Sequence, residues 1–472
     1  MSTPEIELDR PSVEPSTDPP QRSRPHSFRP LILRLHFYAG VFVAPFILIA
    51  AVTGGLYAAA PTIEKFVYSD ILAVDDGGAP LQLTKQAAFA QTAFPNLQIT
   101  GMRPAATARE STRVYFADPS AGAEKQRAVF VDPYTGEILG NEAVWFGYLP
   151  LSTWLDGLHR HLQLGEPGRI YSELAASWLW VVALGGLYLW WAKRRRDKLR
   201  PSERAPSKRA TSLKWHSSVG MWVLLGLVFL SATGITWSTY AGANVKELRT
   251  EMGWERPSLD TTLGGEHAGH GADPSVAAPT VPIDYDQVVA TADRAGVELP
   301  FEITLPAEPG QGIGVAEIDK SFRSTTDAVA LSPTTLAVTS KIDYARDYSF
   351  VAKLADWGIR LHMGFMFGLL NQLLLLAIAI GLLTVIVRGY LMWWQRRPTR
   401  GSAWAVGRPP QRGGIRRMSP IAAVLTVGAA VAIGWFLPLL GWSLLAFVVV
   451  DAAIAGVKRA RTTPATAPPA KY

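Results

Sequence analysis

The chain has no cysteine among its 472 residues. This absence excludes disulfides, thiolate-bound zinc, iron–sulfur clusters and covalently attached c-type haem. Any metal must therefore be held by nitrogen or oxygen ligands.

Charge is also scarce, at 18% of residues against 48% hydrophobic residues and 16 tryptophans. This balance is unlike that of an ordinary soluble protein. The sequence contains neither a Gly-x-Gly-x-x-Gly fingerprint after a strand nor a Walker motif, and no inner segment is large enough for a flavin domain. The chain is not expected to collect hydride for itself.

Long apolar runs are present instead. A helix crosses a hydrocarbon core of about 30 Å with about 20 residues. The runs lie at about residues 35–58, 174–192, 217–240, 365–394 and 419–457. The last is about twice the length of one span and has Pro438 and Gly441 in its middle, so we expect a helical hairpin and six crossings in total. The sequence predicts an α-helical membrane protein with a four-helix core.

Lysine and arginine near the span ends indicate the orientation. They cluster at residues 193–214 and 395–418, before the first span and after the last. These segments are expected to be cytoplasmic, together with both termini, so the net charge of +7 needs no nucleic acid to explain it. Residues 1–30, rich in proline, serine and charge, are expected to form a disordered tail.

Two outer segments, 60–155 and 241–356, follow one plan. The first predicts a helix at Thr84–Phe94, strands at Thr112–Phe116 and Arg127–Val131, and a turn at 132–136. The second predicts a helix at Tyr285–Ala295, strands near Gly312–Glu317 and Ala328–Leu331, and a turn at 332–335. We expect two small α+β modules outside the membrane.

The expected order is therefore a tandem repeat with an added hairpin. It runs as tail 1–30, first span 31–59, first outer module 60–155, outer histidine segment and second span 156–192, basic loop 193–214, third span 215–240, second outer module 241–356, outer histidine segment and fourth span 357–394, basic loop 395–418, hairpin 419–457 and tail 458–472.

Four histidines occupy equivalent places in the two repeats. His36, Gly40 and Thr53-Gly54 recur 180 residues later as His216, Gly220 and Thr233-Gly234. A second pair recurs after 203 residues: Trp154, His159 and Gly165 match Trp357, His362 and Gly368. Each half thus places one histidine near either face of the bilayer. Ionisable side chains at membrane depth usually mark a site.

The arrangement resembles the PepSY-associated transmembrane family of iron-regulated bacterial inner-membrane proteins, which includes ferric-siderophore reductases. The likeness rests on Leu35-His36-x-x-x-Gly40, Leu158-His159-Arg160 with Gly165-x-x-Gly168-Arg169, Trp215-His216-x-x-x-Gly220, and Leu361-His362-x-Gly364 with Phe367-Gly368, over about residues 30–395. It implies PepSY-like outer modules, two b-type haems, a cytoplasmic flavin or NAD(P)H-dependent electron donor, and an extracytoplasmic ferric chelate as acceptor.

Under this resemblance the histidines are candidate haem ligands. His36 with His216 would hold an inner haem and His159 with His362 an outer one. Gly40 and Gly220, one helical turn after the inner histidines, would let a flat ring lie against the helix, although close helix packing explains them too. The Thr53 and Thr233 hydroxyls would serve a propionate or helix packing.

Further residues near the outer face leave alternatives open. His161 is an alternative outer ligand or a propionate contact, because it lies two residues from His159 and points away from it on a helix. Arg169 and Arg360 are candidate propionate contacts, unless nearby acids simply neutralise them. His267 and His270, in a glycine-rich loop, favour a solvated loop over a weak metal site, and His26 has no expected role.

Two other functions fit the same pattern. PepSY-like modules bind or restrain peptidases elsewhere, so a membrane-bound regulator with structural histidines is one alternative. A permease for iron chelates is another, since repeats are common in transporters. The terminal hairpin has no expected role beyond packing or partner contact, and Asp451 within it is expected to be solvated near the inner surface.

Overall fold

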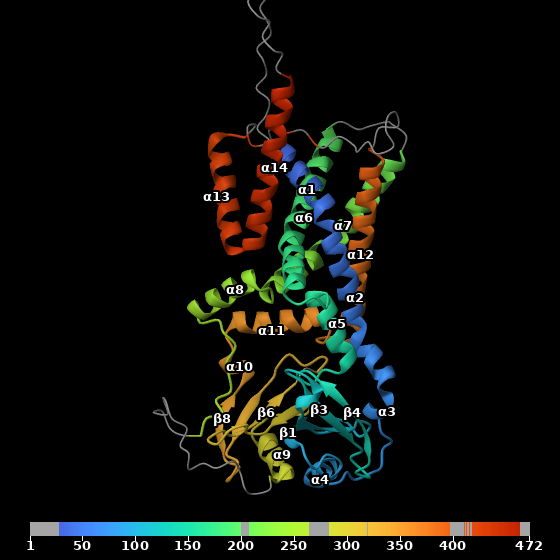
Figure 1. Cartoon of the computed structure of the whole chain (residues 1–472), viewed down its shortest axis with the longest axis vertical. Coiled ribbons are helices and arrows are strands. Elements are labelled where there is room, and N and C mark those ends of the chain that lie inside the picture. Colours follow the sequence, from blue (N-terminus) through green and yellow to red (C-terminus); the bar gives the residue numbers. More distant parts are fainter. Residues whose placement is uncertain are drawn as a thin grey trace, which may run out of the picture.

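The computed structural model describes residues 28–199, 207–263, 283–318, 320–396, 410, 412, 415 and 418–462. The predicted N-terminal tail up to residue 27 with His26, the His267 and His270 loop, residues 200–206 of the first basic loop, most of the second basic loop and the end of the C-terminal tail lie outside these ranges. Figure 1 shows two layers along the long axis, a bundle of helices and a β-sheet domain. Short helices lie between them.

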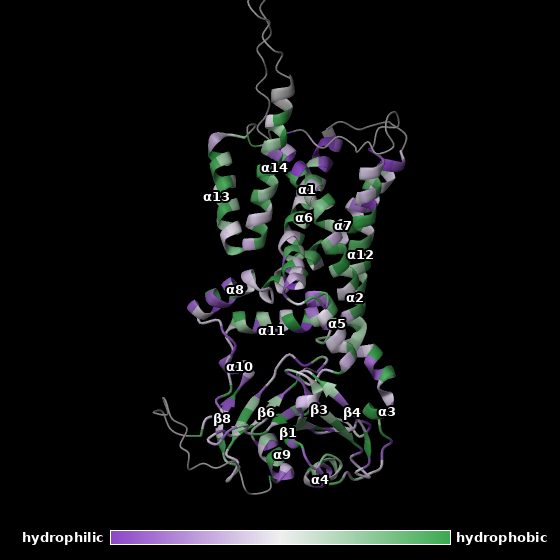
Figure 2. Cartoon of the chain, in the orientation of Figure 1, coloured by the Kyte–Doolittle hydropathy of each residue, from purple (hydrophilic) through white to green (hydrophobic). Residues whose placement is uncertain are grey.

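The bundle confirms a membrane protein. Five described helical segments are long and apolar enough to cross a bilayer: Ala44–Val67, Glu166–Lys198, Lys208–Thr236, Gly368–Trp394 and Pro438–Val457. Its core consists of α1 (Arg29–Phe42), α2 (Ala44–Val67), α6 (Glu166–Leu199), α7 (Lys208–Thr236) and α12 (Gly368–Trp394). Helix α7 packs on α6 and α12, and α2 packs on both as well. Figure 2 shows the apolar colouring concentrated in these helices.

The predicted first span, 31–59, is two helices. Pro45 at the start of α2 has no amide hydrogen, so the helical ladder breaks near Val43. The carbonyl of Val41, which residue 45 would otherwise have bonded, accepts a hydrogen bond from the Tyr390 hydroxyl at 2.8 Å. Helix α2 then continues to Val67, beyond the predicted boundary. A neighbouring helix thus satisfies a carbonyl that lipid could not.

The outer histidine segments are also separate helices. Helices α5 (Pro150–His161) and α11 (Phe350–Met363) precede the spans α6 and α12, and in Figure 1 α11 lies across the bundle between it and the sheet. The corner after α5 requires glycine, because a Cβ on Gly168 would lie 1.8 Å from the carbonyl oxygen of His161. Helix α8 (Tyr240–Glu251) also lies between bundle and sheet.

The outer segments form one eight-stranded antiparallel sheet, where two modules were expected. The strand order is β4-β3-β2-β1-β5-β6-β7-β8. The strands are β1 (Gln98–Arg103), β2 (Thr112–Ala117), β3 (Gln126–Val131), β4 (Ile138–Val144), β5 (Phe301–Thr304), β6 (Ile313–Glu317), β7 (Ala328–Leu331) and β8 (Val338–Ile342). The predicted strands match β2, β3, β6 and β7.

The two halves meet where β1 pairs with β5, aligning Gly101 with Thr304 and Met102 with Ile303. Helices α4 (Leu83–Ala93) and α9 (Tyr285–Arg294) match the predicted helices and pack on the sheet, sharing one core with it. Short α3 (Ser69–Leu72), α10 (Tyr344–Asp347) and a 3-10 turn at Pro119–Ala121 complete the domain.

The terminal hairpin consists of α13 (Pro420–Phe436) and α14 (Pro438–Thr462). It is attached to the bundle by polar contacts, and Asp451, which was expected to be solvated, is 25% exposed and paired with two arginines. Asp451 forms an ion pair with Arg34 on α1, and its carboxylate also accepts from Nε of Arg412 at 3.1 Å. Trp178 Nε1 donates to Ser443 Oγ at 2.8 Å. The hairpin therefore holds the end of α1 that precedes His36.

The β1–β5 junction predicts a sensitive glycine. A Cβ on Gly101 would lie 2.4 Å from the backbone oxygen of Ile303, so Gly101→Ala must separate the two strands. We expect a loss of about 1–3 kcal/mol in unfolding free energy, seen as faster hydrogen exchange in β1 and β5. Gly314→Ala is the matched control, since its nearest atom would be 3.8 Å away. Equal exchange in both variants would contradict the junction.

The hairpin contact predicts a second effect. Asp451→Asn leaves Arg34, whose side chain is 8% exposed, without its anionic partner. We expect a loss of roughly 2 kcal/mol on unfolding in mixed detergent, less than for a fully buried pair because Asp451 is 25% exposed. Asp197→Asn, which breaks an exposed pair with Lys193, should leave stability nearly unchanged, because solvent screens such a pair. Unchanged stability in Asp451→Asn would show that the hairpin is held by apolar packing alone.

Candidate functional site

The structure brings the four repeated histidines together as two pairs. His36 on α1 faces His216 on α7 with ring centroids 6.1 Å apart, and His159 on α5 faces His362 on α11 at 6.4 Å. The layers are separated along α7, because Thr233, which contacts His362, follows His216 by 17 residues, about 26 Å of helix. Each pair draws one histidine from each repeat.

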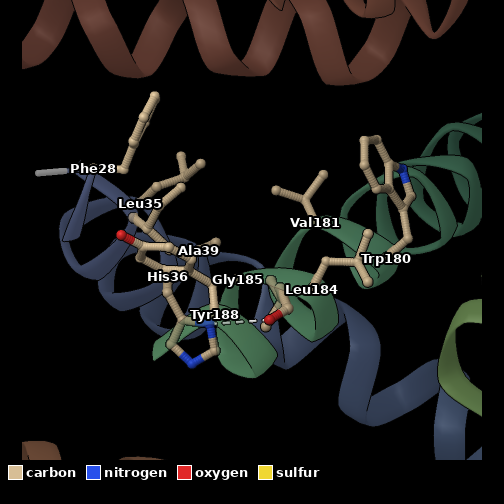
Figure 3. Close-up of a pocket in the computed structure, with 11 residues that line it drawn as sticks. Phe28, Leu35, His36, Ala39, Trp180, Val181, Leu184, Gly185 and Tyr188 are labelled. Atoms are coloured by element: carbon tan, nitrogen blue, oxygen red, sulfur yellow. Dashed lines mark hydrogen bonds between the residues drawn. The ribbon is translucent and has the colours of Figure 1, made fainter. Parts of the chain in front are cut away.

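The inner histidines share one tautomer. Nδ1 of His36 lies 3.0 Å from the carbonyl oxygen of Val182, and Nδ1 of His216 lies 2.9 Å from that of Val385. A carbonyl oxygen can only accept, so Nδ1 carries the hydrogen and Nε2 keeps its lone pair. Figure 3 shows the bond from His36 to α6. Val182 and Val385 are 203 residues apart, the same spacing as the outer histidines.

The outer histidines are hydrogen-bonded at the same ring nitrogen, to threonine. Nδ1 of His159 lies 3.0 Å from Oγ1 of Thr53, and Nδ1 of His362 lies 2.6 Å from Oγ1 of Thr233. Each hydroxyl donates its single hydrogen to its own helix, Thr53 to Ile49 at 2.8 Å and Thr233 to Phe229 at 2.9 Å. With that hydrogen so placed, the threonine oxygen is free to accept from Nδ1. These hydroxyls orient histidines, a role the sequence had not indicated.

Glycine borders all four rings. A Cβ on Gly54 would lie 2.9 Å from Cε1 of His159, and one on Gly186 would lie 3.3 Å from Cε1 of His36. Gly389 and Gly234 give 3.7 Å to His216 and 4.0 Å to His362. Gly186 and Gly389 were missed in the sequence, although they too are 203 residues apart.

The predicted glycines Gly40 and Gly220 do not border the histidines. A Cβ on Gly40 would meet nothing within 4 Å, and one on Gly220 would meet only Val385 at 3.7 Å. Gly40 therefore borders open space. Space for a flat ring there stays a prediction.

His161 does not enter the outer pair. It is the last residue of α5, and its Nδ1 is buried without a hydrogen-bond partner among the described residues. His159 alone of the two has the threonine contact and the facing ring of His362. The structure therefore pairs His159, and not His161, with His362.

A cavity of about 190 Å³ adjoins the outer pair and is lined by both histidines. Its polar lining includes Asp156, Arg160 and Arg169. Nε of Arg160 lies 3.3 Å from the Asp156 carboxylate, and burial raises the pKa of Asp156 while Arg160 opposes that rise. The cavity therefore places two arginines and two acids, Asp156 and Glu173, beside the histidines.

The two candidate arginines have different positions. Arg169 lines the cavity and donates to Thr239 Oγ1 at 2.9 Å and to the carbonyl of Trp237 at 3.2 Å, and the Trp237 ring contacts His362. Arg360 is 2% exposed and donates to the carbonyl of Arg323 at 2.8 Å, close to Asp356. Arg360 is not among the residues that line the cavity.

Each pair supplies two imidazoles and no third protein ligand. Within the described ranges, no group of three or more histidine, aspartate or glutamate residues is placed to hold a metal ion. The arrangement suits a group that brings most of its own ligands.

Comparison with known proteins identifies one family. The family model for the PepSY-associated TM region matches residues 33–396. A search of curated proteins found no match. The matched range includes both histidine pairs and the sheet, and it ends before the α13–α14 hairpin.

The close contact at Gly54 predicts a test of the outer site. In Gly54→Ala the new Cβ must displace the His159 ring, so we expect a loss of about 1–3 kcal/mol in unfolding free energy. Gly428→Ala, in α13 with nothing within 4 Å, should be neutral or slightly stabilising, because alanine favours helix. A neutral Gly54→Ala would mean that His159 does not lie against α2.

Proposed function

The chain belongs to the family defined by the PepSY-associated TM region and is a membrane protein, and from this premise we propose that it carries electrons across the bilayer. In the proposal each histidine pair holds one b-type haem. The donor is a cytoplasmic flavin or NAD(P)H-dependent protein, and the acceptor is an extracytoplasmic ferric chelate of the siderophore type. The protein would act as a ferric-chelate reductase in iron uptake.

The observation that carries the proposal is the spacing of the paired rings. Metal–imidazole bonds are about 2 Å long and the ring centre lies about 1 Å further, so two rings on opposite sides of one ion have centroids about 6 Å apart. The observed separations are 6.1 and 6.4 Å. Both pairs therefore have a spacing at which their two imidazoles would hold one metal ion between them.

The protonation state of the rings supports the same reading. In the two inner histidines Nδ1 is bonded to a carbonyl, which can only accept and so leaves the Nε2 lone pair available, and in the two outer ones Nδ1 is bonded to a threonine hydroxyl. Such a bond fixes ring orientation and raises ligand basicity. All four rings are hydrogen-bonded at Nδ1 to a group of another helix.

The ligand number favours haem over a bare ion. Zinc in protein sites is almost always four-coordinate, whereas each pair here supplies two nitrogens. A porphyrin brings four equatorial nitrogens, and when bound it supplies one-electron transfer at a potential set by its axial ligands and surroundings. The absence of cysteine limits attachment to non-covalent binding.

The remaining residues would set the surroundings. Apolar side chains of the bundle exclude water around the histidines. Arg160 and Arg169 would offer positive charge to carboxylates at the outer site. The positive-inside rule supports an orientation in a bacterial inner membrane with the basic helix ends and both termini in the cytoplasm and the sheet outside.

Optical spectra test the proposal. Protein purified from haem-replete cells should show a reduced b-type spectrum with dithionite and about two haems per chain. His216→Ala and His159→Ala should each lose about half of the haem, because each removes one axial ligand. His161→Ala is the matched control and should keep both.

Full-length, folded protein without a b-type spectrum would overturn the electron-transfer function and favour a PepSY-type regulator of peptidases or a permease. Loss of haem in His161→Ala but not in His159→Ala would show that the outer ligand is assigned to the wrong residue.

A further inference from the structure

An apolar groove of about 310 Å³ lies between α1 and α6 and reaches the inner histidine. Its walls include Phe28, which precedes α1, Leu35 and Ala39 from α1, and Trp180, Leu184 and Tyr188 from α6; His36 and Gly185 also line it. In Figure 3 the side chains of Phe28, Trp180 and Val181 point to one side, while the His36 ring points to the other. The groove is thus a shaped apolar surface beside a functional imidazole.

The groove is a property of the first repeat. Gly185 lies against His36, where a Cβ would be 3.6 Å from Nδ1. The equivalent position 203 residues later is Arg388, and the equivalent of Leu35 is Trp215. The second repeat carries large side chains at both places. The two repeats form equivalent histidine bonds, so at this place they differ only in the side chains beside those bonds.

Positive charge continues from the groove along α6. Arg195 follows Leu184 by 11 residues, about three helical turns, and so lies on nearly the same helix face. Its guanidinium lies 4.0 Å over the Trp191 ring. Basic residues near the inner end of a span attract anionic lipid headgroups, and tryptophan marks the interface level. The apolar wall of the groove and the Arg195 guanidinium therefore lie on nearly the same face of α6.

We propose that this groove binds one acyl chain of an anionic phospholipid, whose phosphate pairs with Arg195. An apolar surface inside the bilayer fits an acyl chain, and a guanidinium at headgroup depth fits a phosphate. The lipid covers the side of His36 that the α1–α6 packing leaves open. This binding does not depend on haem, so it stands or falls separately from the proposed electron transfer.

Native mass spectrometry tests it on the full chain released from nanodiscs of equal phosphatidylglycerol and phosphatidylcholine. We expect one phosphatidylglycerol to be retained per chain. Leu184→Trp should abolish retention by filling the groove, and Arg195→Gln should weaken it about five-fold, the effect of one interfacial arginine. Tyr188→Ala, which widens the groove, should also weaken it and is useful if the tryptophan variant does not fold.

Matched controls come from the same helix and from the other repeat. Val387→Trp alters the position equivalent to Leu184, which is likewise lipid-accessible at 51% against 42% exposure, and it should keep the lipid. Arg194→Gln removes a cation that lies 5.0 Å over Trp190 instead, and it should have little effect. Retention in folded Leu184→Trp, equal retention of phosphatidylcholine, or an isoprenoid quinone in place of phospholipid would each overturn the proposal.

Discussion

The hydrogen bond at Nδ1 of each histidine is the interaction on which the candidate site depends. Inside a bilayer a polar group finds its partner within the protein or not at all. His36 and His216 use a backbone carbonyl of the neighbouring helix, and His159 and His362 use a threonine on α2 or α7. Each bond therefore requires two helices in correct register. The packing of the helices therefore also sets the orientation of the rings.

Both repeats form these histidine bonds, but the two repeats are not identical. Tyr57 and Trp237 are equivalent aromatic residues that both line the outer cavity, yet Tyr57 is 8% exposed and Trp237 40%. At the inner site the equivalent residues Gly185 and Arg388 differ in size and charge. Outside the membrane the two repeats share one sheet, because β1 of the first pairs with β5 of the second. This pairing also covers two strand edges that could otherwise pair with another chain.

The α13–α14 hairpin lies beyond the range that the family model matches, yet it is attached next to the inner histidines. Its Asp451 pairs with Arg34, two residues before His36. The Tyr38 ring lies between the Arg34 guanidinium and Phe447 of α14, with centroid distances of 4.9 Å to each. The hairpin thus restrains the first turns of α1, where a shift would change the His36 contact with Val182. The hairpin, which is not part of the repeat, therefore stabilises the position of α1.

The sequence by itself determined the membrane class, the repeat and the four histidines, because apolar length and exact spacing are local properties of the chain. It also indicated both outer helices and four of the strands through their periodicity. It did not reveal the broken first span, the Gly186 and Gly389 contacts or the roles of Thr53 and Thr233. The tertiary structure decided these, together with the pairing of His159 with His362 and the joining of the two outer segments into one sheet. Each depends on which groups from distant segments meet, and packing sets those partners.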